Sequence, residues 1–122
     1  MSTLRKVRMS LLGILLLGSV VMFLIAGSAV FAAGSFVPHV HLGRALTVFA
    51  LVLPFVAWRD GRRDLVPAGV LAVLFVLQSV TVHAAGSLPW LGALHPLLGA
   101  AVLVGLVHLM RSSTSARELA TP

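Results

Sequence analysis

Two histidines in this chain are each followed by a glycine four residues later: His39 precedes Gly43, and His95 precedes Gly99. On a helix this spacing places both members of a pair on one face, about one turn apart. Two neutral imidazoles at one depth, on different helices of a bundle, are what a bis-histidine haem requires. The glycine leaves room for the porphyrin face beside the helix. We therefore expect haem b, with His39 and His95 as the iron ligands.

A short repeat surrounds these pairs. The tetrapeptide Ala-Ala-Gly-Ser occurs upstream of each histidine, at 32–35 and at 84–87, and the second copy has four extra residues before its histidine. We interpret the repeat as an internal duplication, in which each copy is a helical hairpin that supplies one histidine.

Two residues near the first histidine have alternative roles. His41 lies two residues after His39, so on a helix the two side chains point about 160° apart and only one can face the haem. The spacing to Gly43 favours His39, and His41 becomes the ligand if the helix begins later. Arg44 is the only cation away from the expected cytoplasmic side. We expect it to pair with a haem propionate, with carbonyl groups or with a lipid phosphate.

The other two histidines have no counterpart in the repeat. Three roles stay open for His83: it could line the haem edge, replace a ligand, or form a hydrogen bond with Gln78, which we favour. His108 lies thirteen residues after His95, which is roughly 20 Å along a helix. No second ligand is found at that depth, so we expect a single haem.

The composition places the elements that carry these residues in a membrane. The chain has 122 residues, of which 59% are hydrophobic and 10% are charged, whereas soluble domains are about a quarter charged. Four apolar stretches of about 20 residues are each long enough to cross a bilayer as a helix. They cover about 9–31, 39–58, 65–85 and 91–110. We therefore predict an all-α integral membrane four-helix bundle, one domain built from two duplicated hairpins.

Two end segments need separate interpretation. The first span also has the basic start of a signal peptide, but its apolar run is longer than the roughly 7–15 residues typical of one, so we keep it as a helix. The polar C-terminal tail, 111–122, is expected to be disordered.

The charge distribution predicts the topology. The net charge is +6, and basic residues precede the first span, lie between the second and third, and follow the fourth. The other two connections, 32–38 and 86–94, carry no charge. This pattern predicts a plasma-membrane protein with both termini cytoplasmic, and lipid headgroups rather than nucleic acid as the partner of the cations. The absence of cysteine excludes a covalent c-type haem link and an iron–sulfur site.

The residues also resemble a known family. The sequence HVHLGR at 39–44 resembles the His-Arg-x-x-Gly-Arg signature of the haem A synthase family. Leu-Gln at 77–78, a glycine-containing turn and Leu-His at 94–95 resemble the next two helices of that family's four-helix half. Its members are tandem bundles of eight helices with histidine pairs on the second and fourth helices of each half. The resemblance covers about 36–110 and implies a haem-binding bundle.

The departures from that family limit what the resemblance implies. Segment 36–38 replaces the glutamate that precedes the first histidine, and Val40 replaces the following arginine. The chain is half-length, and no acidic residue lies within a span. We therefore do not carry over the synthase activity. A homodimer would recreate the eight-helix arrangement.

Three classes of function fit these observations. The leading one is a b-type cytochrome that transfers electrons or that stores or relays haem, a carrier rather than a haem A synthase. The second is a non-haem accessory or structural subunit of a larger membrane complex. The third is a small transporter with Arg44, Gln78 and His83 along its path. A hydrolase or transferase is disfavoured, because all three acidic residues lie outside the spans.

Overall fold

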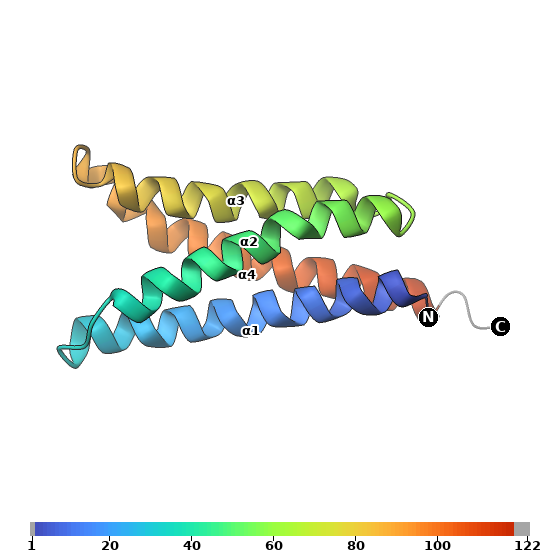
Figure 1. The fold of residues 1–122 in the computed structure, drawn as a ribbon, viewed down its shortest axis with the longest axis horizontal. Helices are drawn as coiled ribbons and strands as arrows, with labels where there is room; N and C mark the ends of the chain where they lie inside the picture. Colours follow the sequence, from blue (N-terminus) through green and yellow to red (C-terminus); the bar gives the residue numbers. More distant parts are fainter. Residues whose placement is uncertain (1, 119–122) are drawn as a thin grey trace.

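The chain folds as four antiparallel α-helices (Figure 1). The structure, a computed structural model, describes residues 2–118. Within that part of the chain there is no strand, and the helices are α1 Thr3–Phe31, α2 Val37–Arg59, α3 Leu65–Ala84 and α4 Pro89–Glu118. α1 and α3 each pack against both α2 and α4. The helices α2 and α4 therefore face one another across the bundle, and the predicted all-α four-helix bundle is confirmed.

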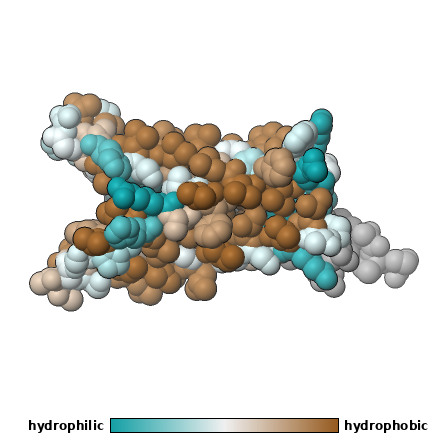
Figure 2. Space-filling view, in the orientation of Figure 1, coloured by the Kyte–Doolittle hydropathy of each residue, from teal (hydrophilic) through white to brown (hydrophobic). Residues whose placement is uncertain are grey.

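The two ends of the bundle differ in chemistry. One end, the basic end, holds the first turn of α1, the α2–α3 connection and the last turns of α4 (Figure 1). The other end, the histidine end, holds the α1–α2 and α3–α4 connections, which lie apart from one another in Figure 1. Figure 2 shows that the surface is hollowed between them, with hydrophilic residues in the hollow.

The outside of the bundle is apolar, as expected for helices in lipid. Each helix contains a stretch of hydropathy and length sufficient to cross a membrane, and only 17–28% of each stretch is buried inside the bundle. Large side chains such as Leu24, Leu97 and Val104 are about 70% exposed, at 68%, 71% and 70%. A brown apolar band covers the middle of the molecule in Figure 2. Side chains of this kind gain by facing lipid rather than water, so the protein is a multi-pass membrane protein.

The buried core repeats with the spacing of the two histidines. His39 and His95 are 56 residues apart (95 minus 39), and residues with that same separation are buried together in the two hairpins. These buried pairs are Leu12 with Ala68, Leu15 with Leu71, Leu46 with Val102, Ala50 with Leu106, and Leu53 with Leu109. The two hairpins thus bury corresponding faces at an offset of 56 residues, whereas the Ala-Ala-Gly-Ser repeats before the histidines are 52 residues apart.

The glycines of α1 differ in what they contact. A Cβ on Gly18 would lie 2.5 Å from a methyl carbon of Leu46, whereas nothing lies within 4 Å of the corresponding position on Gly13 or Gly27. Of these three glycines, only Gly18 is therefore needed for the close packing of α1 against α2.

A buried ionic cluster ties the helices together at the basic end. Arg8 of α1, 7% exposed, forms an ion pair with Asp64 at the start of α3 and another with Asp60 at the end of α2, the latter at 3.3 Å. Ser113 of α4 donates a hydrogen bond from its hydroxyl to Asp64 at 3.3 Å. The main-chain carbonyl oxygen of Ser113 accepts a hydrogen bond from the Arg5 guanidinium at 2.9 Å. The charge pattern of the sequence predicts that the basic residues before the first span contact lipid headgroups. This prediction is wrong for Arg8, which pairs with two carboxylates inside the bundle.

The helix ends differ from the prediction mainly at the C-terminus. Helix α4 continues to Glu118, so the expected disorder is wrong for 111–118. The remainder of the predicted tail, 119–122, lies outside the described residues.

Candidate functional site

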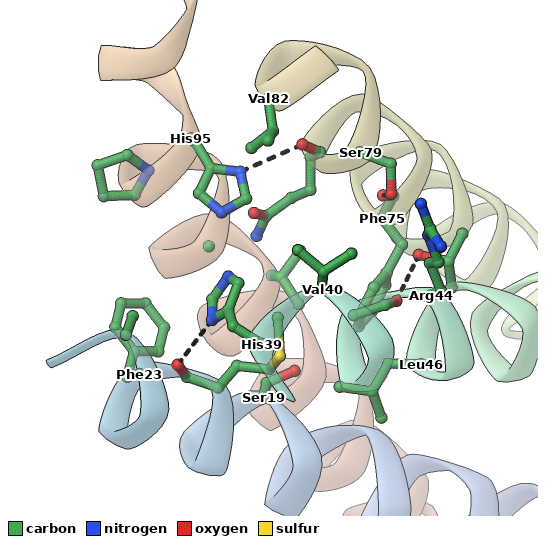
Figure 3. Close-up of a pocket in the computed structure, with 18 of the residues that line it drawn as sticks. Ser19, Phe23, His39, Val40, Arg44, Leu46, Phe75, Ser79, Val82 and His95 are labelled. Carbon is green, nitrogen blue, oxygen red and sulfur yellow. Dashed lines mark hydrogen bonds between the residues drawn. The ribbon is translucent and has the colours of Figure 1, made fainter. Parts of the chain in front are cut away.

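The two histidines predicted as ligands face each other at the histidine end. Their ring centres lie 5.9 Å apart with an angle of 63° between the ring planes, although the residues belong to diagonal helices, α2 and α4. Figure 3 shows His39 and His95 on opposite sides of a cavity, pointing toward one another. Phe36 packs its ring edge-on against His39, with centres 6.1 Å apart.

A main-chain carbonyl orients each imidazole in the same way. Nδ1 of His39 lies 3.1 Å from the carbonyl oxygen of Met22, and Nδ1 of His95 lies 3.1 Å from that of Gln78. In both cases the carbonyl belongs to the residue 17 positions earlier, on the preceding helix of the same hairpin. A carbonyl only accepts, so Nδ1 must carry the proton, and the lone pair of each ring is on Nε2. This is the tautomer and the orienting contact that metal-binding histidines use.

The cavity between the histidines has a volume of about 200 Å³ and is lined by all four helices. α2 and α4 form two opposite walls with the histidines and glycines, and α1 and α3 form the other two. The lining residues include Met22, Phe23, His39, Gly43, Arg44, Gln78, Ser79, His83, His95 and Gly99.

The two glycines are close to side chains from the neighbouring helix. A Cβ on Gly43 would lie 3.0 Å from the terminal methyl of Met22. A Cβ on Gly99 would lie 3.1 Å from the amide nitrogen of Gln78 and 3.1 Å from the ring of Phe23. The residues that orient the histidines through their carbonyls therefore also cover the glycines with their side chains. Ligand pockets are usually about 300–1,000 Å³, so a flat macrocycle requires these side chains to move aside.

Polar side chains line the α2–α3 side of the cavity, and two of them have no partner among the described residues. Arg44 is exposed and forms no ion pair with a described carboxylate. The side-chain amide of Gln78 likewise has no hydrogen-bond partner among the described residues, whereas Ser79 donates to the carbonyl of Phe75 at 3.5 Å. A guanidinium at this depth in a membrane is costly unless an anion or water reaches it, so this wall favours a ligand with an acidic group.

The remaining histidines lie away from the centre of the cavity. His41 is exposed and does not line the cavity, so His39 is the member of the pair that faces it. His83 lines the rim, and its Nδ1 bonds the carbonyl oxygen of Ser79 at 2.7 Å. The expected hydrogen bond from His83 to Gln78 is wrong, since the carbonyl one turn back is nearer. His108 is exposed on α4, toward the basic end.

The donor set of the cavity is small. Among the described residues, no group of three or more His, Cys, Asp or Glu side chains gathers as a metal site. A bare ion would therefore have two imidazole ligands and too few others. An ion between two imidazoles has each nitrogen about 2 Å away, which places the ring centres roughly 6 Å apart. The 5.9 Å separation of His39 and His95 is close to this value, and it also lies within the range of about 4.5–7 Å for ordinary edge-to-face ring contacts.

The sequence interpretation missed the residues on α1. Met22 and Phe23 read as ordinary apolar residues of a span, yet one orients His39 and both cover a glycine. The spacing of the histidines contained the signal, because Met22 and Gln78 are 56 residues apart, as His39 and His95 are.

Comparison with protein-family models, with curated proteins and with solved structures finds no match for this chain. The resemblance to the haem A synthase family and the homodimer therefore stay predictions.

Proposed function

We propose that this protein is a membrane b-type haem protein in which His39 and His95 are the axial ligands. The observation that carries the proposal is the geometry of these two rings, 5.9 Å apart and each oriented by a carbonyl 17 residues earlier. Two histidines occupy both axial positions, which favours electron transfer or the storage and relay of haem over oxygen chemistry.

The protein residues have three tasks in this proposal. The carbonyls of Met22 and Gln78 keep a proton on Nδ1 of each histidine, so that Nε2 is free to bind iron. Gly43 and Gly99 allow the macrocycle to approach α2 and α4 once the covering side chains move. The mostly apolar lining limits how much water contacts a bound iron, which affects its reduction potential.

Arg44 supplies the charge that haem carboxylates need. It lines the cavity, and no described carboxylate pairs with it. A guanidinium binds a carboxylate through two parallel hydrogen bonds. We therefore assign a propionate to Arg44, at the α2–α3 side of the cavity.

The orientation in the membrane follows from the charges. Lys and Arg are concentrated at the basic end, and loops rich in these residues stay on the cytoplasmic side. The proposal therefore places the basic end and both termini in the cytoplasm of a plasma-membrane protein, with the haem near the outer face.

Titration of detergent-purified protein with haem tests the proposal. We expect saturable binding of one haem per chain, a Soret band, sharp α and β bands after reduction, and an electron paramagnetic resonance spectrum of low-spin ferric iron with two imidazoles. Binding that does not saturate, or a high-spin spectrum, would contradict bis-histidine ligation.

A further inference from the structure

At the other end of the molecule, two arginines pack on aromatic rings and form no ion pair with a described carboxylate. At the basic end, the exposed aromatic residues Phe55 and Trp58 of α2 pack with ring centres 6.0 Å apart. The guanidinium of Arg59 lies 5.8 Å from the Phe55 ring centre, and that of Arg62 lies 6.0 Å from the Trp58 ring centre. We call these four residues the Arg–aromatic cluster.

The acidic residues of the same turn form their ion pairs with Arg8 and not with this cluster. Asp60 and Asp64, which alternate with the arginines in the α2–α3 connection, both bond Arg8 inside the bundle. Asp60 also accepts a hydrogen bond from Ser2 at 3.2 Å. Arg59 and Arg62 therefore have no carboxylate partner among the described residues, although carboxylates stand beside them in the sequence.

The backbone of the turn contributes to this separation. Arg62 adopts a left-handed conformation with φ of 66°, and its N–H donates to the carbonyl of Ala57 at 3.1 Å. A non-glycine residue with positive φ is uncommon. Gly61, with φ of 103°, precedes it and allows the chain to reverse sharply. The turn thus directs Asp64 into the bundle while Arg62 lies over Trp58.

The cluster has the chemistry of a lipid headgroup site. Trp at the end of a membrane helix lies at headgroup depth, and guanidinium groups bind phosphate bidentately. Leu51, Phe55 and Trp58 are exposed at helical spacing on α2, so they form an apolar track below the two arginines. We propose that the Arg–aromatic cluster binds one anionic phospholipid: its phosphate between Arg59 and Arg62, and an acyl chain along that track.

Fluorescence quenching by brominated lipid tests this site directly. The chain has two tryptophans, Trp58 and Trp90, and Trp90 lies at the histidine end. In a Trp90→Phe background, emission reports Trp58 alone. The full-length protein is reconstituted at physiological ionic strength in phosphatidylcholine vesicles that contain a small fraction of either brominated phosphatidylglycerol or brominated phosphatidylcholine. Emission is normalised to the same vesicles without bromine. We expect several-fold stronger quenching by brominated phosphatidylglycerol.

A matched pair of variants separates a defined site from general attraction. Arg59→Gln/Arg62→Gln and Lys6→Gln/Arg63→Gln remove equal charge from the same end, and only the first removes the cluster's cations. We expect the lipid preference to disappear in the first variant and to persist in the second, with circular dichroism showing both folded. Added inorganic phosphate should not compete.

Equal loss of the preference in both variants, or equal quenching by both brominated lipids, would overturn the proposal. Displacement by inorganic phosphate would also overturn it, since the site would then recognise free phosphate. None of these outcomes depends on haem, because the cluster and the two histidines lie at opposite ends of the bundle (Figure 1).

Discussion

Arg8 and Asp64 hold equivalent positions in the two hairpins and form an ion pair with each other. They are 56 residues apart, the same separation as His39 and His95. Both are buried, at 7% and 6% exposure. The first hairpin therefore carries a cation at this position, and the second hairpin carries an anion. Two copies of the same hairpin would bring like charges together, so this contact favours packing of the first hairpin against the second.

Breaking this ion pair should destabilise the protein strongly. Removing one partner of a buried pair costs about 3–5 kcal/mol, because the other charge stays buried without compensation. We expect Arg8→Ala to lower the free energy of unfolding by about 3–5 kcal/mol. Asp64→Ala should lower it by less, because Asp60 still pairs with Arg8 at 3.3 Å. The double variant should lose less than the sum, with a coupling energy of about 0.5–3 kcal/mol. Helical circular dichroism during denaturation by a harsh detergent measures the loss.

Lys6→Ala is the control for these variants, because Lys6 is an exposed cation on the same helix. It should leave stability within about 0.5 kcal/mol of the wild type. Strict additivity of Arg8→Ala and Asp64→Ala would show that the two side chains act independently.

Two glycines on α1 should respond differently to alanine. A Cβ on Gly18 would press on the buried Leu46, and overpacking costs about 1–3 kcal/mol. Gly13 has open space, so Gly13→Ala should be neutral or stabilise by up to about 1 kcal/mol through helix propensity. Thermal unfolding of both variants compares them. A more stable Gly18→Ala would contradict the close packing of α1 on α2.

Much of the fold could be predicted because the bilayer constrains it. Apolar stretches of about 20 residues must be helices, and the observed helices begin and end within a few residues of the predicted spans except at the ends of the chain. That His39 and His95 point into the bundle could be predicted from the glycine four residues after each of them.

The partners of these residues could not be predicted in the same way. Arg8 and Asp60 are residue types found in any membrane flank, and only the rotation of each helix decides whether they turn inward. Met22 orients His39 through its main-chain carbonyl oxygen, so the type of its side chain does not reveal this role. The bond from His83 to Ser79 rather than Gln78 depends likewise on side-chain rotation.

Arg44 should matter for haem affinity. If a propionate binds its guanidinium, Arg44→Gln removes a charge-assisted hydrogen bond of about 1.5–3 kcal/mol, which raises the dissociation constant roughly ten- to a hundredfold. Arg44→Lys should recover part of the affinity, because a lysine keeps the charge without the bidentate geometry. Soret titrations give the dissociation constants. Arg63→Gln, which removes a cation at the basic end, should bind haem like the wild type. An unchanged affinity in Arg44→Gln would contradict a propionate partner for Arg44.

The most direct test of the central proposal compares four single variants expressed with ample haem. His39→Ala and His95→Ala remove the facing pair, whereas His41→Ala and His83→Ala remove histidines away from its centre. We expect the wild type and the last two to show a Soret band with sharp α and β bands after reduction. The first two should lose these bands and regain them in part with added imidazole. A wild type without bound haem, or bands that persist in both His39→Ala and His95→Ala, would contradict bis-histidine ligation by this pair.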